Sequence, residues 1–183
     1  ATDCANAVLD GADALMLSGE TSIGSFPIES VKIMARIIER TEEVALDQIP
    51  PLKHSPATKG GAITKAATEV GSTVGAKFLV AFTQSGDSAR RMSRLRSPIP
   101  MLALTPEIGT YNRLALSWGV ESMLTKVVNH TDEMVMQVDS ILIDSKRVNI
   151  GDLVLIVAGS PPGIPGSINA MRVHKIGDAV GGV

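Results

Sequence analysis

FLVAFTQSGDSARRMSRLR, residues 78–96, contains the strand, the loop and the helix that decide the fold of most of this chain. The run FLVAF is short and apolar, which is typical of a strand buried on both faces of a sheet. The segment TQSGDS is polar and turn-forming, and residues 88–96 have the spacing of a helix. A buried strand that leads through a short loop into a helix is the repeating unit of a parallel α/β fold.

Helix and strand patterns continue to alternate on both sides of this unit. We predict five strands and four helices, namely strands at 77–82, 101–104, 120–125, 153–157 and 170–174 and helices at 62–74, 88–96, 108–118 and 131–145. Short strands separated by helices predict a three-layer αβα domain, in which helices cover both faces of a mostly parallel sheet. Only the loop 158–169 joins the last two strands, which leaves no room for a crossover helix. We therefore expect the fifth strand to be antiparallel and to lie at an edge.

The N-terminal part of the chain has a different pattern. The stretch ATDCANAVLDGADALMLSGET, residues 1–21, predicts a helix that ends at Gly11 and then a short buried strand at 14–17. An apolar stripe that starts at Pro27 and runs to about Leu46 predicts one further, longer helix.

Three prolines without periodicity in QIPPLKHSPAT, residues 48–58, predict an extended linker. The expected organisation is therefore an N-terminal segment 1–47, the linker 48–58 and an α/β domain 59–183. Because the chain starts inside a helix–strand unit and without Met, we expect it to be a piece of a larger protein.

The composition limits the function classes. With 44% hydrophobic and 20% charged residues, the 183-residue chain can form a compact core, and its net charge of −2 gives no electrostatic reason to expect nucleic acid binding. No apolar run approaches the roughly 18 residues of a membrane span. Cys4 is the single cysteine, which excludes an internal disulfide and fits the cytoplasm, and the three histidines lack metal-ligand spacing.

One loop of this sequence carries candidate binding chemistry. It consists of six consecutive residues between a predicted strand and a predicted helix: Thr83, Gln84, Ser85, Gly86, Asp87 and Ser88. Hydroxyl groups, a glycine that permits close approach and N–H groups at a helix start are typical of a phosphate site. The alternative is that Ser85, Asp87 or Ser88 only caps the helix.

Residues 8–21, VLDGADALMLSGET, together with Pro27-Ile28-Glu29 and VKIM at 31–34, closely resemble the end of the catalytic (β/α)8 TIM barrel of the pyruvate kinase family. The remainder of the chain follows the C-terminal domain of that family in order. The resemblance implies that residues 1–47 are a remnant of this barrel.

The resemblance also implies a function for the larger protein. Pyruvate kinases are glycolytic, cytoplasmic transferases that move a phosphoryl group from phosphoenolpyruvate to ADP, giving pyruvate and ATP, with Mg²⁺ and usually K⁺. Their substrate and metal ligands lie on earlier barrel strands, so we expect no catalytic or metal-binding residue in this chain. Members of the family form homotetramers partly through the C-terminal domain, and allosteric members bind the phosphate of an activator in a Thr/Ser/Gly loop that matches residues 83–88.

A second loop resembles the family's effector loop. It is GSPPGIPGS, residues 159–167, in which Gly163, Gly166 and Ser167 are the candidate ligand contacts. The alternative is that these prolines and glycines only make a long hairpin connection.

Several residues depart from the pattern of members that bind fructose 1,6-bisphosphate. The Trp and Arg of those members are Val127 and Met134 here, a Lys of some members is Gln84, and a common Thr is Ile168. Asp87 places a negative charge where a second phosphate would be repelled. A sugar monophosphate, a nucleotide monophosphate or no effector is therefore favoured over the bisphosphate.

Two other function classes stay open at this point. One is a free-standing α/β protein that binds phosphate ligands, and the other is a purely structural oligomerisation domain whose phosphate loop is empty. The barrel-like N-terminal segment argues against the first, and ligand binding to this chain would argue against the second.

Overall fold

A computed structural model describes residues 1–49, 57–160, 162 and 166–178. The chain divides into two compact units, Ala1–Lys53 and His54–Val183. Most of the predicted linker, residues 50–56, lies outside the described residues.

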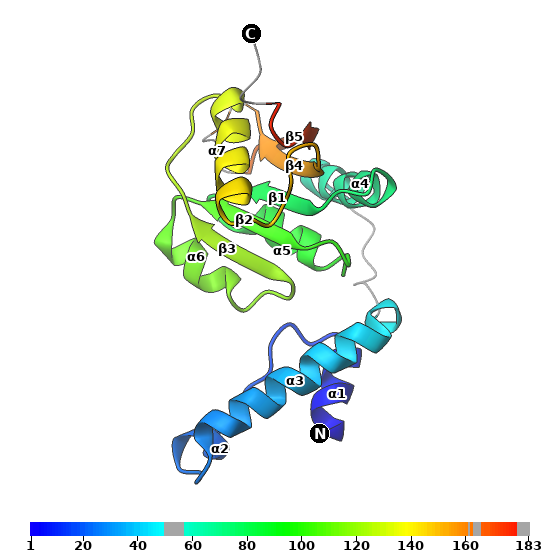
Figure 1. The fold of residues 1–183 in the computed structure, drawn as a ribbon, viewed down its shortest axis with the longest axis vertical. Coiled ribbons are helices and arrows are strands. Elements are labelled where there is room, and N and C mark those ends of the chain that lie inside the picture. The colour runs from blue at the N-terminus through cyan, green and yellow to red at the C-terminus, as the bar shows by residue number, and fades with distance from the viewer. Residues whose placement is uncertain (50–56, 161, 163–165, 179–183) are drawn as a thin grey trace. The chain divides into compact units, whose positions relative to one another are not determined.

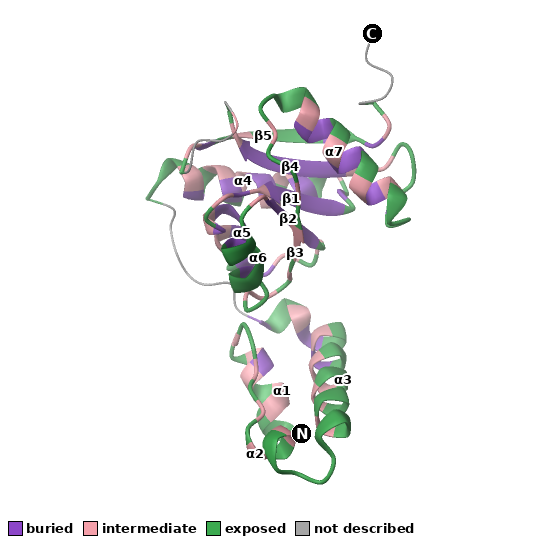
Figure 2. Ribbon diagram, turned by 90° about the vertical axis from the view of Figure 1, so that its left-hand side faces the viewer, coloured by how far each residue is buried: buried purple, intermediate pink, exposed green. Residues whose placement is uncertain are grey.

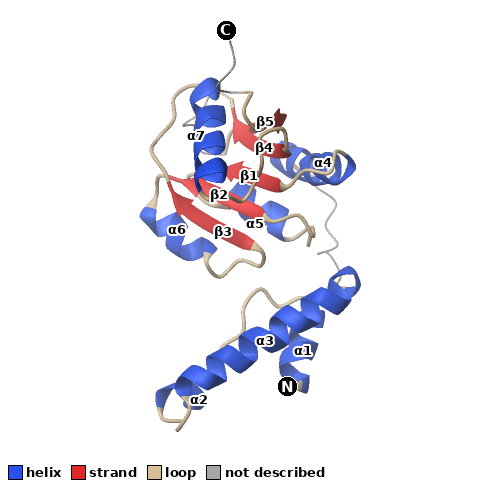
Figure 3. Ribbon diagram, in the orientation of Figure 1, coloured by secondary structure: helices blue, strands red, loops and turns tan. Residues whose placement is uncertain are grey.

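The second unit is built around a five-stranded sheet with the strand order β3-β2-β1-β4-β5 (Figures 1 and 3). Its strands are β1 (Phe78–Phe82), β2 (Met101–Thr105), β3 (Val120–Leu124), β4 (Leu153–Gly159) and β5 (Ile168–Lys175). The first four strands are mutually parallel, and β5 pairs antiparallel with β4 at the edge of the sheet. The predicted five-stranded, mostly parallel sheet with an antiparallel edge strand is confirmed.

Helices cover both faces of this sheet. They are α4 (Lys59–Thr73), α5 (Asp87–Ser93), α6 (Ile108–Leu114) and α7 (Thr131–Asp144). Residues of α4, α5 and α6 share one hydrophobic core with the sheet, whereas α7 packs on the opposite face. Figure 2 shows the buried strands between these helices, which is the predicted αβα arrangement.

The two cores follow from the alternation of side chains along the strands. Leu79 and Ala81 of β1 face the core beneath α4 and α5, while Phe78 and Val80 face the core beneath α7. Because successive strand residues point to opposite faces, a strand covered on both sides must be apolar throughout. This requirement explains the uninterrupted apolar run that identified β1 in the sequence.

Helix ends differ from the predicted ones where side chains or backbone conformation define them. Helix α4 begins at Lys59 rather than at 62, because the Thr58 Oγ1 accepts a hydrogen bond of 3.1 Å from the Gly61 N–H and caps the helix. Helix α5 stops at Ser93, and Arg96 then adopts a left-handed φ of 51°. Helix α6 is also shorter than predicted and ends at Leu114.

The first unit consists of α1 (Thr2–Leu9), α2 (Gly19–Ser22), α3 (Pro27–Ala45) and the short 3₁₀ helix η1 (Leu46–Gln48). Gly11 has a φ of 88° directly after α1, as its predicted role in ending this helix requires. The predicted strand at 14–17 is wrong, because this segment has no strand structure. A strand needs a neighbouring strand for its backbone hydrogen bonds, and the described residues of this unit provide none.

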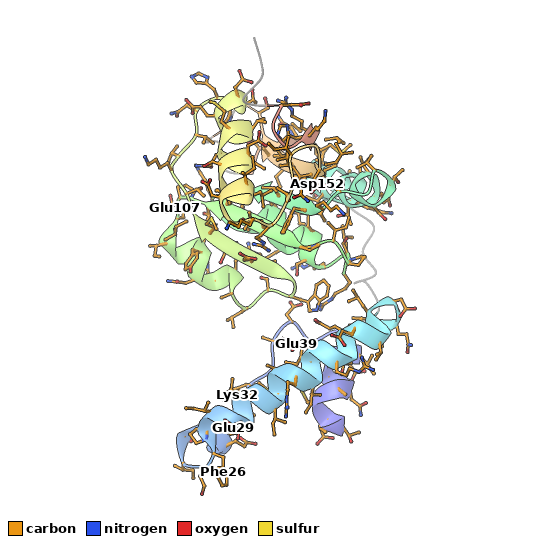
Figure 4. The ribbon with its side chains drawn as sticks, viewed as in Figure 1. Phe26, Glu29, Lys32, Glu39, Glu107 and Asp152 are labelled. Carbon is orange, nitrogen blue, oxygen red and sulfur yellow. The ribbon has the colours of Figure 1, made fainter. Side chains whose placement is uncertain are left out.

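Helix α3 is amphipathic but leaves part of its apolar surface exposed. Ile28 and Val31 are 68% and 50% exposed, respectively. On its polar side, the Lys32 Nζ lies 3.0 Å from the Glu29 Oε1, and both side chains are labelled in Figure 4. Ion pairs of this exposed kind contribute little, so the helix depends mainly on its packing against α1.

A buried polar pair joins α7 to the end of β5. The His174 Nε2 lies 2.7 Å from the Asp139 Oδ1, and the Gly177 N–H donates to the other carboxylate oxygen at 3.1 Å. Both side chains are buried, so their mutual hydrogen bond replaces the water that they lose on folding. The pair fixes the edge strand to the helix on one face of the sheet.

We expect Leu155→Ala to lower the free energy of unfolding by about 2–5 kcal/mol, because the side chain is 0% exposed and its loss leaves a cavity in the core. Urea unfolding followed by circular dichroism measures this change. Leu116→Ala is the matched control, since Leu116 is 69% exposed and its truncation should change stability by less than about 0.5 kcal/mol. Equal effects of the two substitutions would contradict the assigned core.

Candidate functional site

The topology of the sheet places a crevice at the carboxyl ends of β1 and β4. At its carboxyl end β1 is connected through α5 to β2, whereas β4 is connected to β5, which lies on the other side of the β1–β4 pair. Neighbouring parallel strands whose connections leave in opposite directions form a topological switch point, where α/β proteins bind ligands. A binding site in this fold is therefore expected at this edge of the sheet.

A pocket at this edge is lined by residues from both loops singled out in the sequence. From the loop after β1 these are Thr83, Gln84, Ser85, Asp87 and Ser88, and from the loop after β4 they are Gly159, Pro162, Gly166 and Ser167. Gly86 does not line the pocket but shapes the first loop, and Gly163 lies outside the described residues. Two segments about 80 residues apart in the sequence thus share one cavity.

The loop 83–88 is held by its own side chains. The Gly86 N–H donates to the Thr83 Oγ1 at 2.9 Å, and the Asp87 N–H donates to the Ser85 Oγ at 3.4 Å. These two N–H groups are therefore engaged within the loop rather than free, which differs from the sequence expectation. The residue at the N-cap position of α5 is Gly86, and no side chain caps the helix there.

Neighbouring elements support the same loop from outside. The Thr110 Oγ1 on α6 donates to the Gln84 carbonyl, and the Arg90 guanidinium donates to the Ser85 carbonyl at 3.2 Å. Gly86 itself has a φ of 83°, a conformation that side chains with a Cβ disfavour. The loop is consequently ordered before any ligand arrives, which reduces the entropy lost on binding.

The negative charge in the loop is paired. The Arg91 Nε lies 2.6 Å from the Asp87 Oδ2, one helical turn along α5, and Arg91 also donates to the Thr58 Oγ1 at 3.2 Å. The Asp87 carboxylate therefore repels an anionic ligand less than an isolated carboxylate would.

A lysine and an apolar wall complete the pocket, and the lysine was not among the site residues predicted from the sequence. Lys126 follows β3 and lines the pocket beside Val127, Val128 and Met134. The carboxyl ends of all parallel strands meet at the same edge of the sheet, so the position of Lys126 directly after a predicted strand was the signal that could have found it.

The base of the second loop is closed by one side chain. The Asn169 amide accepts from the Ser160 N–H at 2.7 Å and donates to the Ser160 carbonyl at 2.6 Å. The pairing of β4 with β5 changes register beside it, between Ala158 and Gly159. Asn169 therefore holds the two ends of this loop together where they border the pocket.

The start of α7, whose Met134 lines the pocket, is held by a charged side chain. The Glu133 Oε2 accepts a hydrogen bond of 2.8 Å from the Asn129 N–H, just before the helix begins. This backbone hydrogen bond is the main reason that the pKa of Glu133 lies below its ordinary value of 4.5. The carboxylate therefore orders the approach to α7 in its ionised form.

The described part of the chain contains neither a candidate metal cluster nor a candidate membrane-spanning helix. Its His, Cys, Asp and Glu side chains form no group of three or more that could hold a metal ion. None of its helices combines the length with the apolar character that a bilayer span needs.

The fold and the pocket define an α/β domain with a pocket at a topological switch point. Residues 61–174 match the family model described as "Pyruvate kinase, alpha/beta domain", and residues 1–31 match "Pyruvate kinase, barrel domain". The chain belongs to the pyruvate kinase family.

Individual relatives agree with this family. The pyruvate kinase of Mycobacterium tuberculosis H37Rv is 52% identical over 178 residues, which cover 97% of this chain and 38% of the relative. That of Corynebacterium glutamicum is 46% identical, with 97% and 37% covered. A crystal structure of a pyruvate kinase from Cryptosporidium parvum superposes with a TM-score of 0.81 at 28% identity, over 96% of this chain and 35% of that one. The chain thus spans about 38% of the length of its curated relatives.

We expect Gly86→Ala to lower the free energy of unfolding by about 1–2 kcal/mol, because a Cβ at a φ of 83° is strained and would lie 3.2 Å from the Leu114 Cδ2. Gly109→Ala in α6 is the control, since nothing lies within 4 Å of an added Cβ there. It should leave stability unchanged or raise it by up to about 1 kcal/mol. Thermal unfolding of both variants tests this contrast, and an unaffected Gly86→Ala would exclude the left-handed turn.

We expect Glu133→Gln to destabilise the protein at neutral pH and to have a diminishing effect in acid. A pKa lowered by folding means that the stabilisation is present above the ordinary value of 4.5 and is lost as the pH falls through the folded-state pKa. Unfolding measured from pH 7 to pH 3 reports the difference between the two proteins. Asp132→Asn, which removes a charge from the same turn but not the bond to Asn129, should lack this profile.

Proposed function

We propose that this chain is the C-terminal regulatory and assembly domain of a pyruvate kinase, together with the end of its catalytic barrel. The complete enzyme would transfer a phosphoryl group from phosphoenolpyruvate to ADP in the cytoplasm, using Mg²⁺ and K⁺ bound outside this chain. The observation that carries the regulatory part is the shared pocket of the loops 83–88 and 159–167. This chain itself would contribute no catalytic residue.

The proposed effector is a sugar monophosphate or a nucleotide monophosphate. Its phosphate would be bound by the loop 83–88, with Ser85 and Ser88 as hydroxyl donors from the pocket lining. Its remaining part would lie toward Gly166 and Ser167 and against Val127 and Met134, which replace the Trp and Arg of members that bind the bisphosphate. Among the described lining residues, Lys126 is the one cationic side chain, and the wall formed by Val127 and Met134 is apolar. Such a wall favours a ligand with one phosphate.

The proposed assembly is a homotetramer, and strand β5 supports an interface on this domain. Among the strands that the structure describes, β5 pairs only with β4, and its Met171 and Val173 side chains are 40% and 42% exposed. An exposed edge strand with apolar side chains readily pairs with another chain. An effector would then regulate the enzyme by binding one subunit arrangement more tightly than the other, because only differential affinity shifts such an equilibrium.

Isothermal titration of the 183-residue chain with glucose 6-phosphate, ribose 5-phosphate, AMP and fructose 1,6-bisphosphate tests the effector site. We expect saturable binding of a monophosphate. Ser85→Ala combined with Ser88→Ala should weaken it by about tenfold or more, because each lost hydrogen bond contributes about 0.5–1.5 kcal/mol.

Ser140→Ala on α7 is the control for this experiment, because its hydroxyl is exposed and bonds only to Asp144 among the contacts described. It should leave the affinity unchanged. Unchanged affinity in the double variant would contradict the phosphate site, and absence of binding by all four ligands would favour a purely structural assembly domain.

A further inference from the structure

Lys126 occupies a distinctive position in the pocket. It follows β3 (Val120–Leu124), and its carbonyl accepts a hydrogen bond of 3.4 Å from the Gln137 Nε2 on α7. The backbone of this residue is therefore tied to the helix that forms one wall, whereas its side chain is exposed. The ammonium group forms no ion pair with any residue that the structure describes.

The charges around the pocket leave one unneutralised positive group. Among the described residues that line it, Lys126 is the only lysine or arginine and Asp87 is the only carboxylate. Asp87 is paired with Arg91 at 2.6 Å, so it does not neutralise Lys126. Among its described lining residues, the pocket therefore presents one cation, Lys126, and no unpaired carboxylate.

The loop 83–88 cannot supply this charge itself. Its Gly86 and Asp87 N–H groups already donate to Thr83 and Ser85, and its remaining pocket-lining donors are neutral hydroxyl and amide groups. A phosphate monoester carries close to two negative charges at neutral pH, and burying such a group without a cationic partner is unfavourable. Charge-assisted hydrogen bonds are about twice as strong as neutral ones.

We propose that Lys126 is the residue that makes this pocket specific for a phosphate monoester dianion, by donating a charge-assisted hydrogen bond to the phosphate from the loop after β3. The inference rests on the proposed effector site and adds the residue that selects for charge. The loop 83–88 then shapes the phosphate site, and Lys126 determines that the ligand must be anionic. The same chemistry serves a sugar phosphate and a nucleoside monophosphate.

The test is calorimetric titration of the whole chain and of Lys126→Met with glucose 6-phosphate and AMP, each paired with its neutral parent, glucose or adenosine. We expect Lys126→Met to weaken binding of the phosphate ligand by about tenfold and to reduce the dependence of its affinity on ionic strength. Lys126→Arg should retain most of the affinity. Lys65→Met, which removes an exposed lysine from α4, should change neither quantity.

The outcomes separate this inference from the proposed function. If the unmodified chain binds a monophosphate and Lys126→Met binds it equally well with the same salt dependence, the role of Lys126 is wrong while the effector site stands. If the unmodified chain binds neither phosphate ligand, both are wrong. Selective loss of the phosphate ligand in Lys126→Met, with circular dichroism unchanged, supports the assignment, and the phosphate ligand that binds identifies its source.

Discussion

The parallel pairing of β1 with both β2 and β4 is the constraint on which the second unit depends. Strand β1 is bonded on both sides, with Val80 opposite Leu102 in one neighbour and Ile156 in the other. Side chains of β1 lie in both hydrophobic cores, so helices must cover both faces of the sheet. The same pairing brings the ends of β1 and β4 together with opposite connections, which opens the crevice. The pairing of β1 with its two neighbours therefore determines both the hydrophobic cores and the position of the pocket.

Local patterns predicted the elements of this unit well, because β1, β2 and β4 are apolar runs between turn-forming residues. They failed where an element depends on something distant or on a single side chain. Residues 14–17 have the composition of a buried strand, yet no strand lies beside them among the described residues of the first unit. The start of α4 depends on the Thr58 hydroxyl, and the early end of α5 is followed by the left-handed Arg96. Composition alone does not reveal such ends.

The candidate site likewise contains some residues that local sequence patterns reveal and others whose role depends on the folded sheet. The loop 83–88 could be recognised because its chemistry is contiguous in the sequence and lies between a strand and a helix. Lys126 had only the weaker signal of its position directly after a predicted strand, and the clasp of Asn169 on Ser160 had none, since their importance arises from strands that meet only in the folded sheet. The pairing of Asp87 with Arg91 has helical spacing and was readable in principle, but its effect on an anionic ligand emerges only once the pocket is located.

The elements that wall the pocket are also those that carry the exposed edge of the sheet. Met134 at the start of α7 lines the pocket, and Asp139, further along the same helix, is bonded to His174 on β5. Asn169, at the start of β5, closes the second loop. Because buried polar pairs and packed helices tend to switch between discrete arrangements rather than deform gradually, a displacement of α7 would be shared by β5. If the proposed effector contacts the loops before α7 and β5, the buried bond between Asp139 and His174 provides a short physical connection from its site to the strand proposed for assembly.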